Sequence, residues 1–184
     1  MDNGASSYRR FLDGDDSGMV ELIRDYKDGL LLYLNSYTNN YSIAEDCVQD
    51  TFIKLAVKKP KFREKSSFKT WLYTIGRNVM MSHMRKAARR NDVLIDDCYN
   101  ISAETDLEKD HLREEQKIRL HQAIKRLKPE YQQVLYLTYF EDFSNIETAH
   151  IIGKSKKQVE NLLYNARRSL RSELEKEGFD YEGL

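Results

Sequence analysis

Apolar side chains recur every three or four positions along most of this 184-residue chain. This spacing predicts amphipathic α-helices, because it gathers the apolar residues on one side of each helix. The chain holds only two prolines, Pro60 and Pro129, which fit the end of one such helix and the first turn of another. The expected helices span residues 19–37, 42–58, 66–90, 106–127 and 129–140, with a further pair within residues 144–170. Residues 1–18 are polar and are expected to form a short arm, so the pattern predicts an all-α protein.

Polar residues mark where the earlier helices are expected to begin. Ser42 and Glu45 have the spacing of a capping box, in which each side chain bonds the other residue's backbone N–H. Ser66 or Ser67 is expected to cap the next helix. Gly76 lies inside that helix, where glycine costs about 1 kcal/mol against alanine. The apolar period around it is strong enough to keep the prediction of a continuous helix.

Residues 144–170 have the pattern of a helix-turn-helix. Ser144 with Glu147, and Ser155 with Gln158, are two capping boxes in close succession. Gly153 lies between them, where a helix must stop and positive φ is needed. Two helix starts this close predict a short helix, a tight turn and a second helix.

The second helix of this pair has one apolar and one polar face. The apolar stripe consists of Val159, Leu162, Leu163, Ala166 and Leu170. The first helix is expected to bury Ile146, Ala149, Ile151 and Ile152. The polar face holds side chains that pair with phosphates or read base edges, namely Lys156, Lys157, Gln158, Asn161, Asn165 and Arg168. They lie where a recognition helix would enter the major groove, although an ordinary surface helix with solvated charges would share this pattern.

The charges of the chain sum to zero but are unevenly distributed. Residues 59–90 carry ten basic and one acidic side chains, and residues 151–172 carry six and one. Residues 91–115 between them carry nine acidic and two basic side chains. Two basic blocks separated by an acidic one are typical of two nucleic-acid-binding modules joined by a linker.

The basic helix within residues 66–90 carries a second candidate surface. Its cations are interleaved with Tyr73, Met80 and Met81, a mixture that suits unstacked single-stranded bases at least as well as a duplex. Trp71 is expected to be a core residue. Cys47 and Cys98 are too few for a disulfide framework or a zinc site and are expected to be reduced thiols. With no apolar stretch of signal-peptide or membrane-span length, the sequence favours a soluble cytoplasmic protein.

Two sets of motifs, in order, resemble a known family. The first set is Ala44, Glu45, Asp46, Gln49, Asp50, Phe52 and Leu55, followed by Phe68, Trp71, Leu72, Ile75, Arg77, Asn78 and the basic run to Arg90. The second is Ala123, Ile124, Leu127, Pro129, Tyr139, Phe140, Ser144, Glu147, Ala149, Gly153, Ser155, Val159, Ala166, Arg167 and Leu170. Together they resemble the sigma-70 family of RNA polymerase sigma factors, in its compact extracytoplasmic-function (ECF) group.

The resemblance implies two small helical domains joined by a flexible acidic linker, the C-terminal one a helix-turn-helix. Residues 1–90 would be region 2, residues 91–112 the linker and residues 113–177 region 4. The implied partners are the β′ clamp and β flap of the bacterial RNA polymerase core, promoter DNA and an anti-sigma factor. Neither an enzymatic activity, a cofactor, a metal nor a small-molecule substrate is implied.

The resemblance also implies three sets of site residues. Core polymerase would be bound by Glu45, Asp46, Gln49, Asp50 and Phe52. The −10 DNA would be bound by Lys61, Phe62, Arg63, Lys69, Arg77, Asn78, His83, Arg85, Arg89 and Arg90. The −35 DNA would be bound by Ser155, Lys156, Lys157, Gln158, Glu160, Asn161, Asn165 and Arg168.

Three positions depart from the family pattern. Thr148 replaces a usual aliphatic residue, Lys128 interrupts a usual Leu-Pro pair, and Glu160 places an acid on the recognition helix. Glu160 would repel phosphate but could accept a hydrogen bond from a cytosine amino group.

Other functions remain as alternatives. A conventional helix-turn-helix regulator would bind a symmetric site without polymerase. A sigma-like regulator that does not support initiation is a further alternative. A carboxylate nuclease at Glu45, Asp46 and Asp50 is disfavoured, because no His or Cys completes a ligand set.

Overall fold

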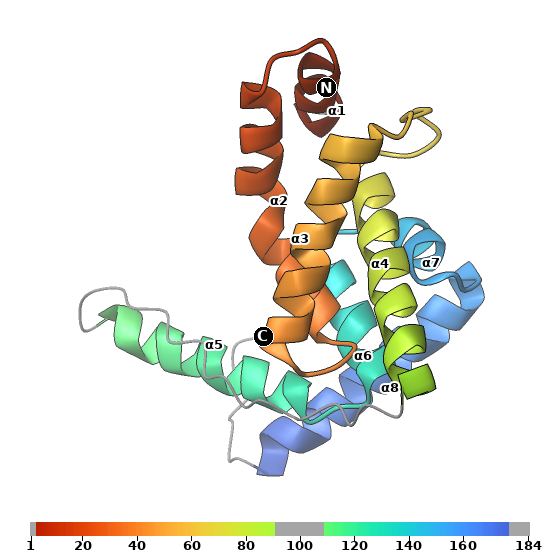
Figure 1. Cartoon of the computed structure of the whole chain (residues 1–184). Coiled ribbons are helices and arrows are strands. Elements are labelled where there is room, and N and C mark those ends of the chain that lie inside the picture. Colours follow the sequence, from red (N-terminus) through yellow and green to blue (C-terminus); the bar gives the residue numbers. More distant parts are fainter. Residues whose placement is uncertain (1–2, 91–108, 177–184) are drawn as a thin grey trace.

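The computed structural model describes residues 3–90 and 109–176 of the chain. Within them it consists of helices and connecting loops (Figure 1). The first half holds α1 (Asn3–Leu12), α2 (Ser17–Asn35), α3 (Tyr41–Lys58) and α4 (Phe68–Arg90). The second half holds α5 (Lys109–Lys125), α6 (Pro129–Leu135), the π-helix η1 (Tyr136–Phe140), α7 (Asn145–Ile152) and α8 (Lys156–Lys176). The all-α prediction is confirmed, whereas the expected linker at residues 91–112 and Cys98 lie largely outside the described residues.

Helix α1 corrects the expectation of a polar arm at residues 1–18. Ala5, Tyr8 and Phe11 are spaced at one helical turn and all three are buried. Tyr8 packs against Phe68 and Trp71 of α4, with ring centroids 5.5 Å away in each case. The short amphipathic period therefore forms a helix because residues some sixty positions later cover it.

The N-terminus of α3 is capped differently from the sequence prediction. Asn40, rather than Ser42, has the extended backbone of an N-cap residue, and its Oδ1 accepts a hydrogen bond from the Ile43 N–H at 3.1 Å. The predicted capping box of Ser42 and Glu45 is therefore wrong. Helix α3 ends where Lys59 adopts a left-handed conformation just before Pro60.

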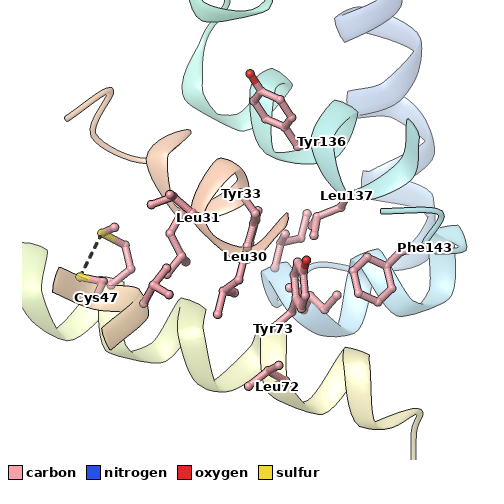
Figure 2. Packing of buried hydrophobic residues seen from close by; sticks show 14 of the residues in the cluster. Leu30, Leu31, Tyr33, Cys47, Leu72, Tyr73, Tyr136, Leu137 and Phe143 are labelled. Atoms are coloured by element: carbon pink, nitrogen blue, oxygen red, sulfur yellow. Dashed lines mark hydrogen bonds between the residues drawn. The ribbon is translucent and has the colours of Figure 1, made fainter. Parts of the chain in front are cut away.

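Helices α2, α3 and α4 enclose the core of the first half. Gly76 of α4 allows a close approach to α2, since a Cβ at this position would lie 2.9 Å from Leu30 Cδ1. This contact explains a glycine within a helix. Cys47 of α3 is buried, its thiol lies 4.0 Å from Met80 Sδ, and burial raises its pKa to about 11 (Figure 2).

Both predicted capping boxes of the helix-turn-helix are confirmed. Ser144 and Glu147 cap α7 reciprocally, and Gly153 ends that helix with φ of 71°. At the start of α8 the Ser155 N–H donates to Gln158 Oε1 at 2.8 Å, and the Gln158 N–H donates to Ser155 Oγ at 3.2 Å. The start and end of each helix are thus encoded locally.

The helix that begins at Pro129 does not continue regularly to residue 140. It changes to π-helical hydrogen bonding at Tyr136–Phe140. Buried Gln132 stabilises the turn before it by donating to the carbonyl oxygens of Lys125 and Leu127 at 3.1 and 2.9 Å. The π-helical segment places Tyr136 and Leu137 in the core.

The two halves pack against each other and share one buried apolar cluster. Figure 2 shows Leu30 and Tyr33 of α2 and Tyr73 of α4 meeting Leu137 and Phe143 of the second half. The rings of Tyr73 and Phe143 meet edge to face, 5.0 Å apart. Helix α7 lies alongside α4 (Figure 1). The helix-turn-helix is therefore placed directly on the basic helix of the first half.

Candidate nucleic-acid interface

The basic residues of α4 divide into a solvent-facing and a covered group. Asn78, Arg85 and Arg89 are exposed, whereas Lys69, Arg77 and His83 are half-buried. Arg85 Nε donates to the Met81 carbonyl oxygen at 3.2 Å, so its guanidinium lies along the helix surface. Arg90 is the last residue of α4. The exposed group is available to phosphates without rearrangement.

The covered group of α4 faces the second half. Lys69 lies 2.8 Å from the Glu141 carboxylate. Arg77 lies close to Gly153, since a Cβ there would be 3.4 Å from its guanidinium. Two of the predicted −10 residues, Lys69 and Arg77, therefore lie against the second half in this structure.

The loop of residues 59–67 is held in place by an aromatic cluster. Phe62 packs on Trp71 and Phe68 with ring centroids 5.1 and 5.6 Å away. The Tyr8 hydroxyl donates to the Pro60 carbonyl oxygen at 2.8 Å. Lys61 and Arg63 remain exposed beside this cluster. The loop therefore presents two cations from a fixed apolar base.

A cavity of about 530 Å³ opens between this loop and α7. Its walls are formed on one side by residues of the loop and of α4, among them Lys61, Phe62, Arg63 and Trp71, and on the other by Ile146, Glu147 and His150. This volume lies within the range of small-ligand pockets. The cavity is lined by three predicted −10 residues, Lys61, Phe62 and Arg63, and its opposite wall is formed by α7.

Glu147 is one of the residues that line this cavity. It accepts hydrogen bonds from Ser144 within its own half, and from Thr70 and Ser67 of the first half at 3.1 and 3.5 Å. Partial burial alone raises the pKa of Glu147, but the hydrogen bonds from Ser144, Thr70 and Ser67 outweigh it and lower that pKa below its ordinary value. The carboxylate is therefore charged at neutral pH.

The outer face of α3 carries the predicted polymerase-binding carboxylates. Asp46, Gln49 and Asp50 are exposed and Glu45 is half-buried, whereas Phe52 lies in the core. Ile53 and Val57 were not among the predicted site residues, but they continue this face and are 56% and 70% exposed. Asp46, Asp50, Ile53 and Val57 follow one another at intervals of four, three and four residues, which places them on one face of a helix. This spacing was the signal in the sequence that could have identified Ile53 and Val57.

The predicted polar face of α8 is exposed at every position. Ser155, Lys156, Lys157, Gln158, Glu160, Asn161, Asn165 and Arg168 all face solvent. Glu160 lies 3.6 Å from Lys156, one turn earlier. Tyr164 was not among the predicted site residues, but it is 68% exposed on the same face, three residues after Asn161. The signal in the sequence was an aromatic residue that lies outside the apolar stripe of the second helix.

Helix α7 partly departs from its predicted packing. Ala149, Ile151 and Ile152 are buried as expected, but Ile146 is 65% exposed, so its assignment to the core is wrong. Thr148 takes the buried position instead. Among residues 3–90 and 109–176, no three His, Cys, Asp or Glu side chains gather as metal ligands would.

Comparison with known proteins identifies the family. The Sigma-70 region 2 family model matches residues 22–90, and the Sigma-70, region 4 model matches residues 117–170. RNA polymerase sigma factor YlaC of Bacillus subtilis is 32% identical over 158 residues, which cover 85% of this chain and 91% of YlaC. ECF RNA polymerase sigma factor BldN of Streptomyces coelicolor is 26% identical over 85% of this chain and 60% of BldN. The chain belongs to the sigma-70 family and is an RNA polymerase sigma factor of the ECF group.

A solved structure agrees with this assignment. The sigma factor RpoE from Bartonella quintana, in complex with the anti-sigma factor NepR, matches with a TM-score of 0.69 and 25% identity. The match covers 84% of this chain and 95% of RpoE. The conventional regulator is not favoured, because the first half matches region 2 rather than a ligand-sensing module. None of the helices in the described part of the chain has the length and apolar composition needed to span a membrane.

Proposed function

We propose that three surfaces of this sigma factor divide the work of promoter recognition. The outer face of α3 binds core RNA polymerase, the loop of residues 59–67 with α4 binds the −10 strand, and α8 reads the −35 element. The sequence units that carry these surfaces are residues 1–90 and 113–177, joined by residues 91–112. The chain acts in the cytoplasm by binding and not by catalysis.

The observation that supports this division most is the separation of charge by surface. On α3 the exposed carboxylates Asp46 and Asp50 come first and the exposed cations Lys54 and Lys58 follow, whereas the loop, α4 and α8 expose mainly cations. Cations neutralise phosphates and supply most of the affinity for nucleic acid. The carboxylates in the first half of α3 would instead repel DNA, which favours a protein as the partner of that part of the helix.

At the −10 element, the loop and the exposed end of α4 would hold an unpaired base and its backbone. Flipping a base out of the duplex costs a few kcal/mol, which stacking and phosphate contacts must offset. Phe62 and Trp71 supply aromatic faces at the cavity, and Lys61 and Arg63 supply cations beside it. Asn78 and Arg89 extend this surface along α4.

Runoff transcription with purified bacterial core polymerase and a pool of genomic promoter fragments tests the proposal. Wild-type protein should yield discrete transcripts, and the pair Asn78→Ala and Arg89→Ala should abolish them. Arg24→Ala is the matched control, because Arg24 is an exposed arginine of α2 on the acidic part of the chain. Absence of transcripts with wild-type protein would contradict initiation and leave a sigma-like regulator.

Polymerase binding is tested separately. Asp46→Ala with Asp50→Ala should weaken binding to immobilised core polymerase, whereas Asp28→Ala, an exposed carboxylate of α2, should not. Equal binding of all three proteins would exclude the α3 face as the contact.

An anti-sigma factor is a further partner within this proposal. Its basis is the similarity to RpoE, which was solved in complex with NepR. Purification of the tagged chain from its own host, with mass spectrometry of what is bound, would identify such a partner. Recovery of polymerase subunits alone would contradict it.

A further inference from the structure

The exposed side chains at the start of α8 are not equally free to meet DNA. Ser155 Oγ and Gln158 Oε1 each accept a hydrogen bond from the other residue's backbone N–H, so both side chains are engaged in the cap of the helix. The other exposed side chains of the first two turns are Lys156, Lys157, Glu160 and Asn161. In a recognition helix, the N-terminal residues are the ones that contact base edges.

Glu160 differs from its neighbours in the hydrogen bonds that it can make. Lysine and arginine side chains only donate, an asparagine amide both donates and accepts, and a carboxylate only accepts. From Lys156 to Arg168 the sequence holds a single carboxylate, that of Glu160. Its side chain is 46% exposed. At this one place, the predicted polar face of α8 therefore carries a charged group that can only accept.

Lys156 lies beside this carboxylate, one turn earlier on the helix. Its Nζ is 3.6 Å from Glu160 Oε1. An exposed pair of this kind stabilises the fold very little. It does place a cation next to the acid, and the exposed cations Lys156, Lys157 and Arg168 outnumber the one carboxylate. The face therefore still attracts phosphate, and the acid is tolerated close to DNA.

The ion pair does not use up the carboxylate. A carboxylate has two oxygens with about four acceptor sites in all. The contact with Lys156 is made at Oε1. Glu160 can therefore accept a further hydrogen bond from a base while it keeps its lysine partner.

The position of Glu160 on α8 points it towards a groove of DNA. The buried side of α8 includes Val159, Leu163 and Ala166. With about 100° of rotation per residue, the direction opposite to this buried side lies between Glu160 and Asn161. When the outer side of a helix enters the major groove, side chains on both sides of that direction face base pairs.

Cytosine is the base that suits a carboxylate best. In the major groove cytosine presents its N4 amino group as a donor, whereas guanine presents two acceptors and thymine an acceptor and a methyl group. Adenine presents a donor at N6 beside an acceptor at N7. A carboxylate opposite guanine or thymine would lose water without gaining a donor, and this cost falls on the wrong sequence.

The geometry points to Glu160 as a residue that determines the −35 sequence. Its carboxylate accepts a hydrogen bond from the N4 amino group of a cytosine, so one position of the preferred −35 element is a C·G pair whose cytosine faces Glu160. The inference rests on the proposed function of α8, and it deepens that function by naming a base and the group that selects it.

A randomised −35 element tests this inference. One promoter recovered by runoff transcription is prepared as a pool in which the −35 region is random and the rest is unchanged. The pool is bound by holoenzyme made from core RNA polymerase and this protein, and the bound fragments are sequenced. With wild-type protein, one position should favour cytosine on one strand by about fivefold or more over guanine and thymine.

Two substitutions of Glu160 should change that position alone. Glu160→Gln should shift its preference from cytosine to adenine, because a glutamine amide pairs with N6 and N7 of adenine. Glu160→Ala should abolish the preference there and leave the other positions as they are. Circular dichroism establishes that both variants are folded.

Glu175→Gln is the matched control. Glu175 is an exposed carboxylate in the last turn of the same helix, and it pairs with Arg171 four residues earlier at 3.3 Å. The substitution removes the same charge from the same kind of ion pair, far from the N-terminal turns. Its base preferences should equal those of wild type at every position.

The outcomes separate this inference from the proposed function. If wild-type holoenzyme enriches a −35 sequence but folded Glu160→Gln and Glu160→Ala enrich the same one, the inference is wrong and Glu160 is only a partner of Lys156. A changed position that favours a base other than cytosine in wild type would overturn it as well. Failure of the proposed function of α8 would instead appear as no enriched −35 sequence with wild-type protein.

Discussion

Tyr73 and Glu141 are 68 residues apart in the chain, yet they are joined by a 2.6 Å hydrogen bond across the contact between the two halves. The Tyr73 side chain is fully buried. Burial, and then the negative charge and hydrogen bond of Glu141, raise the pKa of Tyr73 well above its ordinary value. The phenol is therefore a permanent donor, and the bond couples the stability of the halves.

Tyr73→Phe should lower the free energy of unfolding of the whole chain. The ring remains, so no cavity forms, but a hydrogen bond to a charged acceptor is lost, which costs about 1.5–3 kcal/mol. Urea denaturation followed by circular dichroism measures this. Tyr164→Phe is the control, because Tyr164 is exposed, and it should change stability by less than about 0.5 kcal/mol. Equal changes in the free energy of unfolding for Tyr73→Phe and Tyr164→Phe would show that the hydrogen bond from Tyr73 to Glu141 does not stabilise the fold.

Acid should loosen the contact between the halves through Glu147. The folded state lowers the pKa of this carboxyl below its ordinary value of 4.5, so the charged form stabilises the fold at neutral pH. That contribution is lost as the pH falls below about 4.5 and through the lowered value, because the unfolded chain binds the proton first.

The measurement is the difference in melting temperature between wild type and Glu147→Gln as a function of pH. Wild type should be the more stable protein at pH 7, and the difference should shrink as the pH falls below 4.5. Glu130→Gln controls for the loss of one negative charge at an exposed site of α6. A difference that stays constant into acid would mean that the Glu147 charge does not stabilise α7.

Helix α1 should control the shape of the loop at the −10 surface. Tyr8→Phe removes only the hydrogen bond to the Pro60 carbonyl oxygen and should cost about 0.5–1.5 kcal/mol of stability. Tyr8→Ala also removes a buried ring from the aromatic cluster and should cost about 3–5 kcal/mol.

Runoff transcription at a temperature where Tyr8→Phe is fully folded tests whether the loop itself is affected. Transcription should fall in Tyr8→Phe and remain normal in Tyr41→Phe, a half-buried tyrosine at the start of α3. Normal transcription by a folded Tyr8→Phe protein would limit α1 to a role in stability.

The sequence predicted most features that depend on neighbours in the chain, although the box of Ser42 with Glu45 was wrong, and it missed those that depend on distant residues. The boxes of Ser144 with Glu147, and of Ser155 with Gln158, involve residues three apart, so local spacing was enough to find them. The buried side of α1 was missed because its partners, Phe68 and Trp71, come from α4.

The contact between the halves could not be predicted for the same reason. Lys69 was recognised as a cation suited to DNA, but its partner Glu141 follows 72 residues later. Ile146 matched an apolar period. Its side chain nevertheless lies at the cavity beside the loop of residues 59–67, where it remains exposed. Periodicity places residues on helix faces, but it does not say which faces will meet.

On α8, two kinds of substitution should have different effects on −35 binding by the polymerase holoenzyme. Lys157→Ala removes one exposed cation from the first turn of α8. If that cation neutralises one phosphate, affinity should fall about equally on all −35 sequences. The slope of log affinity against log salt should also become shallower by about 0.9.

Asn161→Ala removes a side chain suited to a base edge. It should cost about 1–3 kcal/mol on the preferred −35 sequence and relax the preference at one position, with the salt slope unchanged. Binding titrations over a range of salt concentrations, on promoters that differ at single −35 positions, separate the two effects. Lys117→Ala, an exposed lysine of α5, is the control for Lys157→Ala. If Asn161→Ala weakened every sequence equally, Asn161 would not read a base edge, and sequence preference would have to come from other residues on this face, such as Glu160 or Tyr164.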